Sequence, residues 1–252
     1  TSWTIGTLHN RCSEGGVRCA ISTSRFSMKT AFISDIHGNY EALKAVLAEI
    51  DRLGATQVYC AGDVVGYYSQ INECCSELRE RGIPCVMGNH DWYMAGGGFC
   101  PRSRSVNECL AYQRRIIDPD HLDWLRTLPV QREIGVVRVV HGGWADPIDE
   151  YLKPTAEYFQ QIQGEAFVSG HTHVQTVQRF GTKVYCNPGS VGQPRDSDPR
   201  AAFAVFESGE FTLHRVEYDM QKVFDLMEAA GFSDYYYGGL KTGARNLRRL
   251  PD

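Results

Sequence analysis

The sequence predicts an α/β fold, because short apolar segments alternate with amphipathic helical segments from residue 29 onward. A second observation supports this fold class: several of the apolar, strand-like segments end on a short polar loop that contains Asp, Asn or His. Ligands of α/β proteins bind outside the carboxyl ends of the strands. We therefore expect a functional site at that edge of the sheet.

The expected strands and helices follow from the spacing of the apolar residues. Asn39 is suited to cap the first helix, and Gly54 is suited to end it. Ser208-Gly209 is a hairpin signal between the last two strands. The expected strands are residues 30–34, 57–61, 83–87, 136–140, 166–169, 183–186, 201–206 and 211–216, and the expected helices are residues 40–53, 72–81 and 220–230.

One domain is expected over residues 28–252. Residues 1–27 are polar and rich in Gly and Ser, and they lack the apolar core of a secretory signal, so we interpret them as an N-terminal extension outside the core. Residues 92–130 are less regular and are expected to hold a helix or two that form a cap beside the site. Residues 219–252 are expected to be a C-terminal helix followed by a Tyr-rich tail, for which the sequence predicts no role.

Composition argues against several other classes of protein. The formal net charge is −4 and there is no run of Lys and Arg, so nucleic acid is not an expected partner. No stretch approaches the roughly 20 apolar residues that span a bilayer. The nine cysteines are odd in number and form no C-x-x-C pair, which favours buried free thiols and a cytoplasmic location. No protein partner is indicated.

Residues of the types that bind metals follow five of the expected strands. A single Asp or His at a strand end is usually a turn or capping residue, but five such ends at one sheet edge favour a metal centre. In extended chain, residues two apart point to the same side, so each Asp/His or His/His pair here would face one pocket. Imidazole, carboxylate and amide oxygen ligands suit first-row transition metals better than Ca²⁺. The candidates are Asp35 and His37, Asp63, Asn89 and His90, His141, and His171 and His173.

The order of these motifs resembles a known family. The chain has Asp-x-His-Gly, Gly-Asp-x-x-Gly, Gly-Asn-His-Asp, an apolar strand followed by His, and Gly-His-Thr-His, in that order. Over about residues 28–216 this set is similar to the calcineurin-like metallophosphoesterase superfamily. The segment 187–195 resembles its small bacterial and archaeal phosphodiesterase-type branch. The resemblance implies a four-layer α/β sandwich, with two mixed β-sheets flanked by helices.

The resemblance also implies two divalent transition-metal ions, with Mn²⁺ preferred and Fe²⁺, Ni²⁺, Co²⁺ or Zn²⁺ as alternatives. Such ions activate a bridging water as hydroxide, which attacks phosphorus directly, so no covalent phospho-enzyme is expected. When the family's ligand positions are carried over by motif, the first ion would be held by Asp35, His37 and His173. The second would be held by Asn89, His141 and His171, and Asp63 would bind both.

Further residues near these ligands are expected to assist. As an imidazolium, His90 would stabilise charge or protonate the leaving oxygen. Asp91 would orient His90 or cap a helix, and both interpretations remain open. Gly66 and Tyr67 occupy the positions where protein phosphatases of the superfamily carry Asp and Arg, so a protein phosphatase is not expected. Arg195 would replace the missing phosphate clamp or be a solvated turn residue.

Aromatic residues that follow the ligand motifs have two interpretations. They would stack on a nucleobase or an aryl group of the substrate, or they would pack in the core. The aromatic residues in question are Tyr67, Trp92, Tyr93 and Trp144.

The predicted function is hydrolysis of a phosphodiester or phosphomonoester, with a small molecule or nucleotide as substrate. One alternative is a dinucleoside polyphosphate hydrolase, which the same metal centre would serve. An alternative of another class is a catalytically silent metal-binding scaffold of the same fold. The complete set of expected ligands argues against the scaffold, because loss of turnover usually removes one or more of them.

Overall fold

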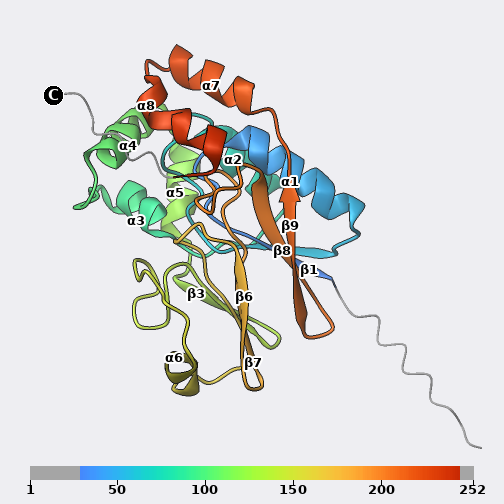
Figure 1. The fold of residues 1–252 in the computed structure, drawn as a ribbon. Coiled ribbons are helices and arrows are strands. Elements are labelled where there is room, and N and C mark those ends of the chain that lie inside the picture. The colour runs from blue at the N-terminus through green and yellow to red at the C-terminus, as the bar shows by residue number, and fades with distance from the viewer. Residues whose placement is uncertain (1–28, 245–252) are drawn as a thin grey trace, which may run out of the picture.

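The computed structural model describes residues 29–244 of the 252-residue chain, and Figure 1 shows two β-sheets with helices around them. Both sheets are mixed, since each contains parallel and antiparallel neighbours. In spatial order, the first sheet is β2 (Gln57–Cys60), β1 (Thr30–Ile33), β8 (Ala201–Glu207) and β9 (Glu210–Val216). The second is β3 (Gln131–Ile134), β4 (Val137–Val140), β5 (Ala166–Val168), β7 (Lys183–Asn187) and β6 (Thr176–Phe180).

Most helices gather beside the first sheet, whereas α6 lies by the second (Figure 1). Asn39 caps the first helix as predicted, because its side-chain oxygen accepts the Ala42 N–H at 3.1 Å. The helices are α1 (Tyr40–Arg52), α2 (Ile71–Glu80), α3 (Asn89–Gly96), α4 (Arg104–Ile116), α5 (Pro119–Arg126), α6 (Ala156–Gln160), α7 (Met220–Ala229) and α8 (Asp234–Tyr237), followed by the 3₁₀ turn η1 (Gly238–Thr242).

Alternating side chains of β1 show how the layers pack. Ala31 and Ile33 belong to a core shared with α1, α2 and α5, whereas Phe32 belongs to a core between the two sheets. On the outer face of the second sheet, Phe167 packs with Phe159 of α6. The order is therefore helices, sheet, sheet, helix, and the predicted four-layer α/β sandwich is confirmed.

The predicted strand at residues 83–87 is wrong. This segment forms only an isolated parallel bridge between Cys60 and Cys85. Pro84 has no N–H to donate and cannot continue a ladder, although its carbonyl accepts the Cys60 N–H at 3.0 Å. The edge strands β3 and β6 were not predicted, because both are largely exposed or half-buried and neither contains a long apolar run.

The hairpin between β8 and β9 agrees with the prediction. Ser208 and Gly209 both have positive φ, of 55° and 87°. Positive φ at both central residues is what a two-residue hairpin turn of type I′ requires.

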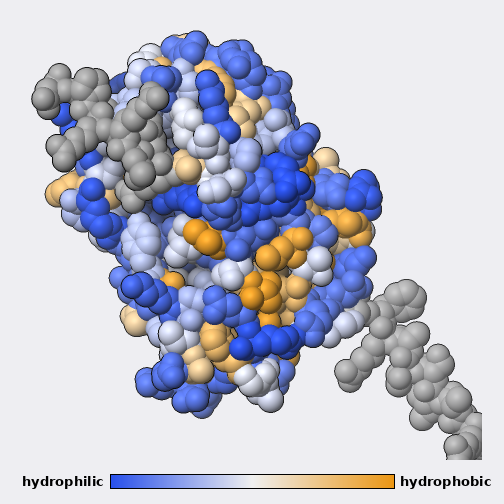
Figure 2. Space-filling model, viewed as in Figure 1, coloured by the Kyte–Doolittle hydropathy of each residue, from blue (hydrophilic) through white to orange (hydrophobic). Residues whose placement is uncertain are grey.

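The surface seen in Figure 2 is mainly hydrophilic, with apolar residues gathered near its middle, where Figure 1 places β6 and parts of β8 and β9. Exposed apolar side chains include Val174, just before β6, and Leu213 of β9. Within residues 29–244, no helix has both the length and the apolar character needed to cross a membrane.

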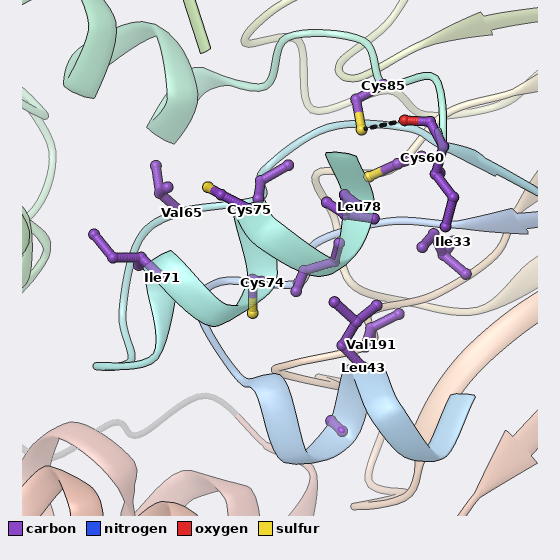
Figure 3. Close-up of a cluster of buried hydrophobic side chains, with 14 of the residues drawn as sticks. Ile33, Leu43, Cys60, Val65, Ile71, Cys74, Cys75, Leu78, Cys85 and Val191 are labelled. Atoms are coloured by element: carbon purple, nitrogen blue, oxygen red, sulfur yellow. Dashed lines mark hydrogen bonds between the residues drawn. The ribbon is translucent and has the colours of Figure 1, made fainter. Parts of the chain in front are cut away.

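The cysteines that the structure describes are buried free thiols, as predicted. Figure 3 shows Cys60, Cys74, Cys75 and Cys85 among apolar side chains of the core, where the Cys85 thiol donates to the Ile83 carbonyl at 3.4 Å. Burial raises the pKa of the Cys74 thiol, so it remains protonated and unreactive. Cys12 and Cys19 lie outside the described residues.

Candidate metal centre

The expected ligand residues lie on loops that follow the strands and on the first turn of one helix. Loops after β1, β2, β4 and β5 provide Asp, His or both, and Asn89 and His90 begin α3. All of these side chains are buried, with exposed fractions of 5% or less. The structure brings them together from five separate segments: Asp35, His37, Asp63, Asn89, His90, His141, His171 and His173.

The first group of potential ligands contains Asp35, His37 and His173. His173 Nε2 lies 3.2 Å from Asp35 Oδ1 and 3.1 Å from His37 Nε2. His37 Nε2 lies 3.8 Å from Asp35 Oδ1. Three potential ligand atoms thus surround one small space.

The second group is built around His141. Its Nε2 lies 3.1 Å from His171 Nδ1 and 3.2 Å from Asn89 Oδ1. Asp63 lies between the two groups, since its Oδ2 is 3.3 Å from His141 Nε2 and 3.7 Å from His37 Nε2. A single carboxylate therefore contacts both sets of imidazoles.

The backbone of the ligand loops differs from the extended conformation assumed in the sequence analysis. Asp35 and His37 have φ of 54° and 55°, and His171 and His173 have φ of 65° and 60°. These are left-handed conformations, which Asp and His tolerate better than bulky residues do. The chain at these two pairs is therefore not extended, and the predicted extended geometry is wrong. His171 and His173 face the same cavity but join different ligand groups.

The electrostatics of the site favour charged carboxylates. Burial alone would raise the pKa of Asp63, but His141 and His90 outweigh it and lower the pKa well below its usual value. The pKa of Asp35 is also lowered, mainly by His173 against the effect of burial. The two Asp charges raise the pKa of His141 to about 10, although burial opposes this.

Asp91 does not contact the His90 ring. Its carboxylate accepts four backbone N–H groups, from Asp63 and Val64 at 2.9 Å, Val65 at 3.1 Å and Gly88 at 3.0 Å. It therefore ties the Asp63 loop to the start of α3. Burial raises the pKa of Asp91 to about 7, and the negative charge of Asp63 acts in the same direction.

His90 lies beside the ligands, and its Nδ1 is buried without a hydrogen-bond partner. Burial lowers the pKa of His90 to about 4, although Asp63 opposes this. The neutral imidazole is thus favoured at pH 7, whereas the sequence hypothesis used the imidazolium. Gly66 leaves room for this ring, since a Cβ at Gly66 would lie 2.4 Å from His90 Nδ1.

Residues 28–210 match the family model of the calcineurin-like phosphoesterase superfamily domain. The chain belongs to the calcineurin-like phosphoesterase superfamily. It is 33% identical to the uncharacterized protein MJ0912 of Methanocaldococcus jannaschii over 220 residues, which cover 77% of this chain and 90% of that protein. It is 26% identical to the phosphodiesterase YfcE of Escherichia coli over 181 residues, 72% of this chain and 88% of YfcE.

A solved structure of a metallophosphoesterase from Sphaerobacter thermophilus has the same fold. The TM-score is 0.76 at 31% identity, and the match covers 86% of this chain and all of the other. The predicted family is therefore confirmed, and the superfamily implies divalent metal ions.

Backbone carbonyl groups fix the orientation of three imidazoles at the site. The Nδ1 atoms of His37 and His141 lie 3.0 and 2.8 Å from the carbonyl oxygens of Val65 and Ala61, and His173 Nδ1 lies 2.5 Å from the Gln193 carbonyl. Carbonyl oxygens accept only, so each of these Nδ1 atoms carries a proton. Burial lowers the pKa of His37 and of His173, so the Nε2 of each of these two rings is left with a lone pair. Two such lone pairs face each other where His37 and His173 approach, which suits a cation between them.

The cavity at the metal centre has a volume of about 30 Å³ and includes Tyr67 and Arg195 in its wall. Arg195 Nη2 donates to the Tyr67 hydroxyl at 2.9 Å. The other aromatic candidates do not line the cavity. Tyr93 is buried beside His90, with ring centroids 6.3 Å apart, Trp144 packs on Phe159 and Phe167, and Trp92 is half-exposed.

Arg102 and Tyr151 of the cavity wall were missed by the sequence analysis, as was Asp149, which contacts Arg102. Arg102 pairs with Asp149, and their closest atoms are 2.5 Å apart. Asp149 lies 3.5 Å from His171 Nε2, and the Tyr151 ring lies 4.1 Å from the His171 ring. Arg102 comes from the segment 92–130, which thus contributes to the cavity. No local pattern marks these residues, because their contacts join distant segments.

Proposed function

We propose that this protein hydrolyses a phosphoester at two divalent metal ions, with a phosphodiester as the preferred class of substrate. The observation that carries the proposal is the position of Asp63, whose Oδ2 lies within 3.7 Å of both His37 Nε2 and His141 Nε2. A carboxylate between two sets of imidazoles suits a pair of cations better than a single one. Phosphodiesters are preferred because YfcE, a relative over most of its length, is a phosphodiesterase.

The first ion would be held by Asp35, His37 and His173, and the second by Asn89, His141 and His171, with Asp63 shared. When bound, such ions lower the pKa of water and offset the charge of phosphoryl oxygens. In the proposed site of the second ion, Asn89 Oδ1 lies 3.2 Å from His141 Nε2. Mn²⁺ is the preferred ion, because carboxylate, amide and imidazole ligands occur together here.

The remaining residues would act on the substrate. Neutral His90 has one N–H, which can donate a hydrogen bond to a phosphoryl or leaving oxygen. Arg195 has no carboxylate partner among the described residues, so its guanidinium can pair with a phosphoryl oxygen. Asp91 would hold the Asp63 loop in place rather than take part in proton transfer. The segment 92–130 would cap the site.

The test is metal-dependent hydrolysis of bis-p-nitrophenyl phosphate and p-nitrophenyl phosphate. Protein stripped of metal should be inactive and should recover with Mn²⁺ added alone, and the diester should be the better substrate. Asp63→Asn should bind both ions more weakly and lose most turnover even with Mn²⁺ in excess. Wild-type activity of this variant would contradict the bridging role.

The scaffold alternative makes the opposite prediction. A catalytically silent protein would bind two ions per chain, measured by elemental analysis, and would release no p-nitrophenolate with any divalent metal. A dinucleoside polyphosphate hydrolase would instead be active with Mn²⁺ and would cleave dinucleoside tetraphosphate much faster than either aryl ester.

A further inference from the structure

A second cavity, which we call the tyrosine pocket, adjoins the cavity of the candidate metal centre. It has a volume of about 60 Å³, and its wall includes Tyr67, Tyr68, Tyr235 and Tyr236 together with Ser105. Residues at the border of the two cavities are shared, since Tyr67, Ser103 and Arg195 line both.

The Tyr-rich C-terminal segment is held against α4. The Tyr236 hydroxyl donates to the Glu108 carboxylate of α4, and the Tyr236 ring packs on Phe232 with ring centroids 4.9 Å apart. Phe232 in turn contacts Tyr112 of α4, with centroids 5.3 Å apart. Figure 1 shows α8 beside α4 at the same end of the molecule. This segment is therefore a fixed wall of the pocket.

The chemistry of the pocket suits a planar ligand with a polar edge. Among the residues that the structure describes, none that lines it is Asp or Glu, and the cation Arg195 lies at the border with the metal centre. Gln193 supplies an amide, whose Nε2 donates to the Tyr68 hydroxyl at 3.2 Å. Tyrosine rings offer faces for stacking, and hydroxyl and amide groups offer hydrogen bonds to ring substituents.

The guanidinium of Arg195 faces neutral partners. It donates to the Tyr67 hydroxyl and to Gln193 Oε1, at 2.9 and 2.6 Å. The Arg195 guanidinium, which no carboxylate among the described residues neutralises, would therefore lie between a phosphate at the metal centre and the tyrosine pocket. A ligand that spans this border would present an anionic group on one side and an aromatic group on the other.

We propose that the tyrosine pocket binds a planar aromatic ester substituent of the substrate, a nucleobase or an aryl ring, while the phosphate lies at the metal centre. This inference rests on the proposed function. The pocket has room for several water molecules, which the ring would displace. The C-terminal segment then selects aromatic phosphodiesters over alkyl ones.

The experiment compares phenyl p-nitrophenyl phosphate with methyl p-nitrophenyl phosphate in the presence of Mn²⁺. Both release p-nitrophenolate, so the ratio of kcat/KM, divided by the ratio of their rates with hydroxide alone, reports binding of the second substituent. We expect a corrected ratio of about ten or more, because stacking on aromatic side chains has effects of this size.

Two variants change the tyrosine pocket without altering a residue that is proposed to bind metal. Ser105→Phe on α4 should fill it and bring the corrected ratio to about one, with methyl p-nitrophenyl phosphate unaffected. Tyr235→Ala should remove one ring and lower the ratio in the same direction. Ala111→Phe is the matched control, because Ala111 lies on the exposed face of the same helix and should keep the wild-type ratio.

Binding supplies a readout that does not need turnover. By calorimetry, Mn²⁺-loaded protein should bind phenylphosphonate about tenfold more tightly than methylphosphonate, and Ser105→Phe should lose this preference. Tighter binding of phenylphosphonate without hydrolysis of either diester would support the pocket and reject the proposed hydrolysis. Turnover without preference, or a preference that Ser105→Phe leaves intact, would overturn the pocket. Absence of both would overturn both proposals.

Discussion

Replacement of Asp91 by Asn tests how the Asp63 loop is held in place. The Asp91 carboxylate accepts four buried N–H groups, two on each oxygen. An Asn side chain keeps one oxygen and turns its amide N–H₂ toward the other two donors, which then lose their acceptor. A hydrogen bond to a charged group contributes about 1.5–3 kcal/mol, so two lost bonds cost about 3–6 kcal/mol.

This loss is large beside the stability of an ordinary domain, about 5–15 kcal/mol. We therefore expect Asp91→Asn to lower the melting temperature by roughly 10 °C or more. Urea unfolding followed by circular dichroism, at a pH above the Asp91 pKa of about 7, measures the free energy directly. The matched control is Asp118→Asn, because Asp118 caps α5 at an exposed position, where Asn caps equally well.

The same measurement separates a positioning role of Asp91 from a direct catalytic role. A positioning role requires a large loss of stability in Asp91→Asn and almost none in Asp118→Asn. If Asp91→Asn unfolds within about 1 kcal/mol of wild type yet loses turnover, the hydrogen-bond argument is refuted and a direct catalytic role is favoured.

Four further predictions concern the site. His90→Ala should retain both metals by elemental analysis and lose about 10²-fold in kcat, whereas loss of metal would make His90 a ligand. Gly66→Ala, at φ 114°, should displace the His90 ring and lower kcat at least tenfold, whereas Gly54→Ala, with φ 69° and open space, should lower only stability. Arg195→Gln should raise KM for diesters about tenfold, and an unchanged KM would remove it from phosphate binding. Mn²⁺ at a hundred times its dissociation constant should stabilise the fold by about 2.7 kcal/mol for each occupied site against chelator-treated protein, and an unchanged melting temperature would argue against a folded metal site.

The metal-type residues were readable from the sequence because they are local signals. An apolar strand followed by Asp or His is visible within about six residues, and the helix cap at Asn39 was found in the same way. Their shared location followed from the rule that strand ends in α/β proteins lie at one edge. The family resemblance then added the grouping of the ligands.

Features that depend on distant contacts were not readable. Tyr67 and Arg195 are joined across 128 positions, as are Glu108 and Tyr236, so no window of sequence connects the tyrosine pocket to the metal centre. Local preference also misled at residues 83–87, where an apolar run favours a strand but Pro84 cannot donate to the ladder.

The left-handed backbone at the ligand positions has a consequence for how the protein changes over time. Five proposed ligands have φ between 54° and 65°, a conformation that costs a side-chain-bearing residue about 1 kcal/mol each and glycine almost nothing: Asp35, His37, Asp63, His171 and His173. A glycine at any of them would relieve local strain while it disables the centre. Backbone strain and metal binding are thus opposed at these five positions, so Asp and His are retained there only while the chemistry is needed.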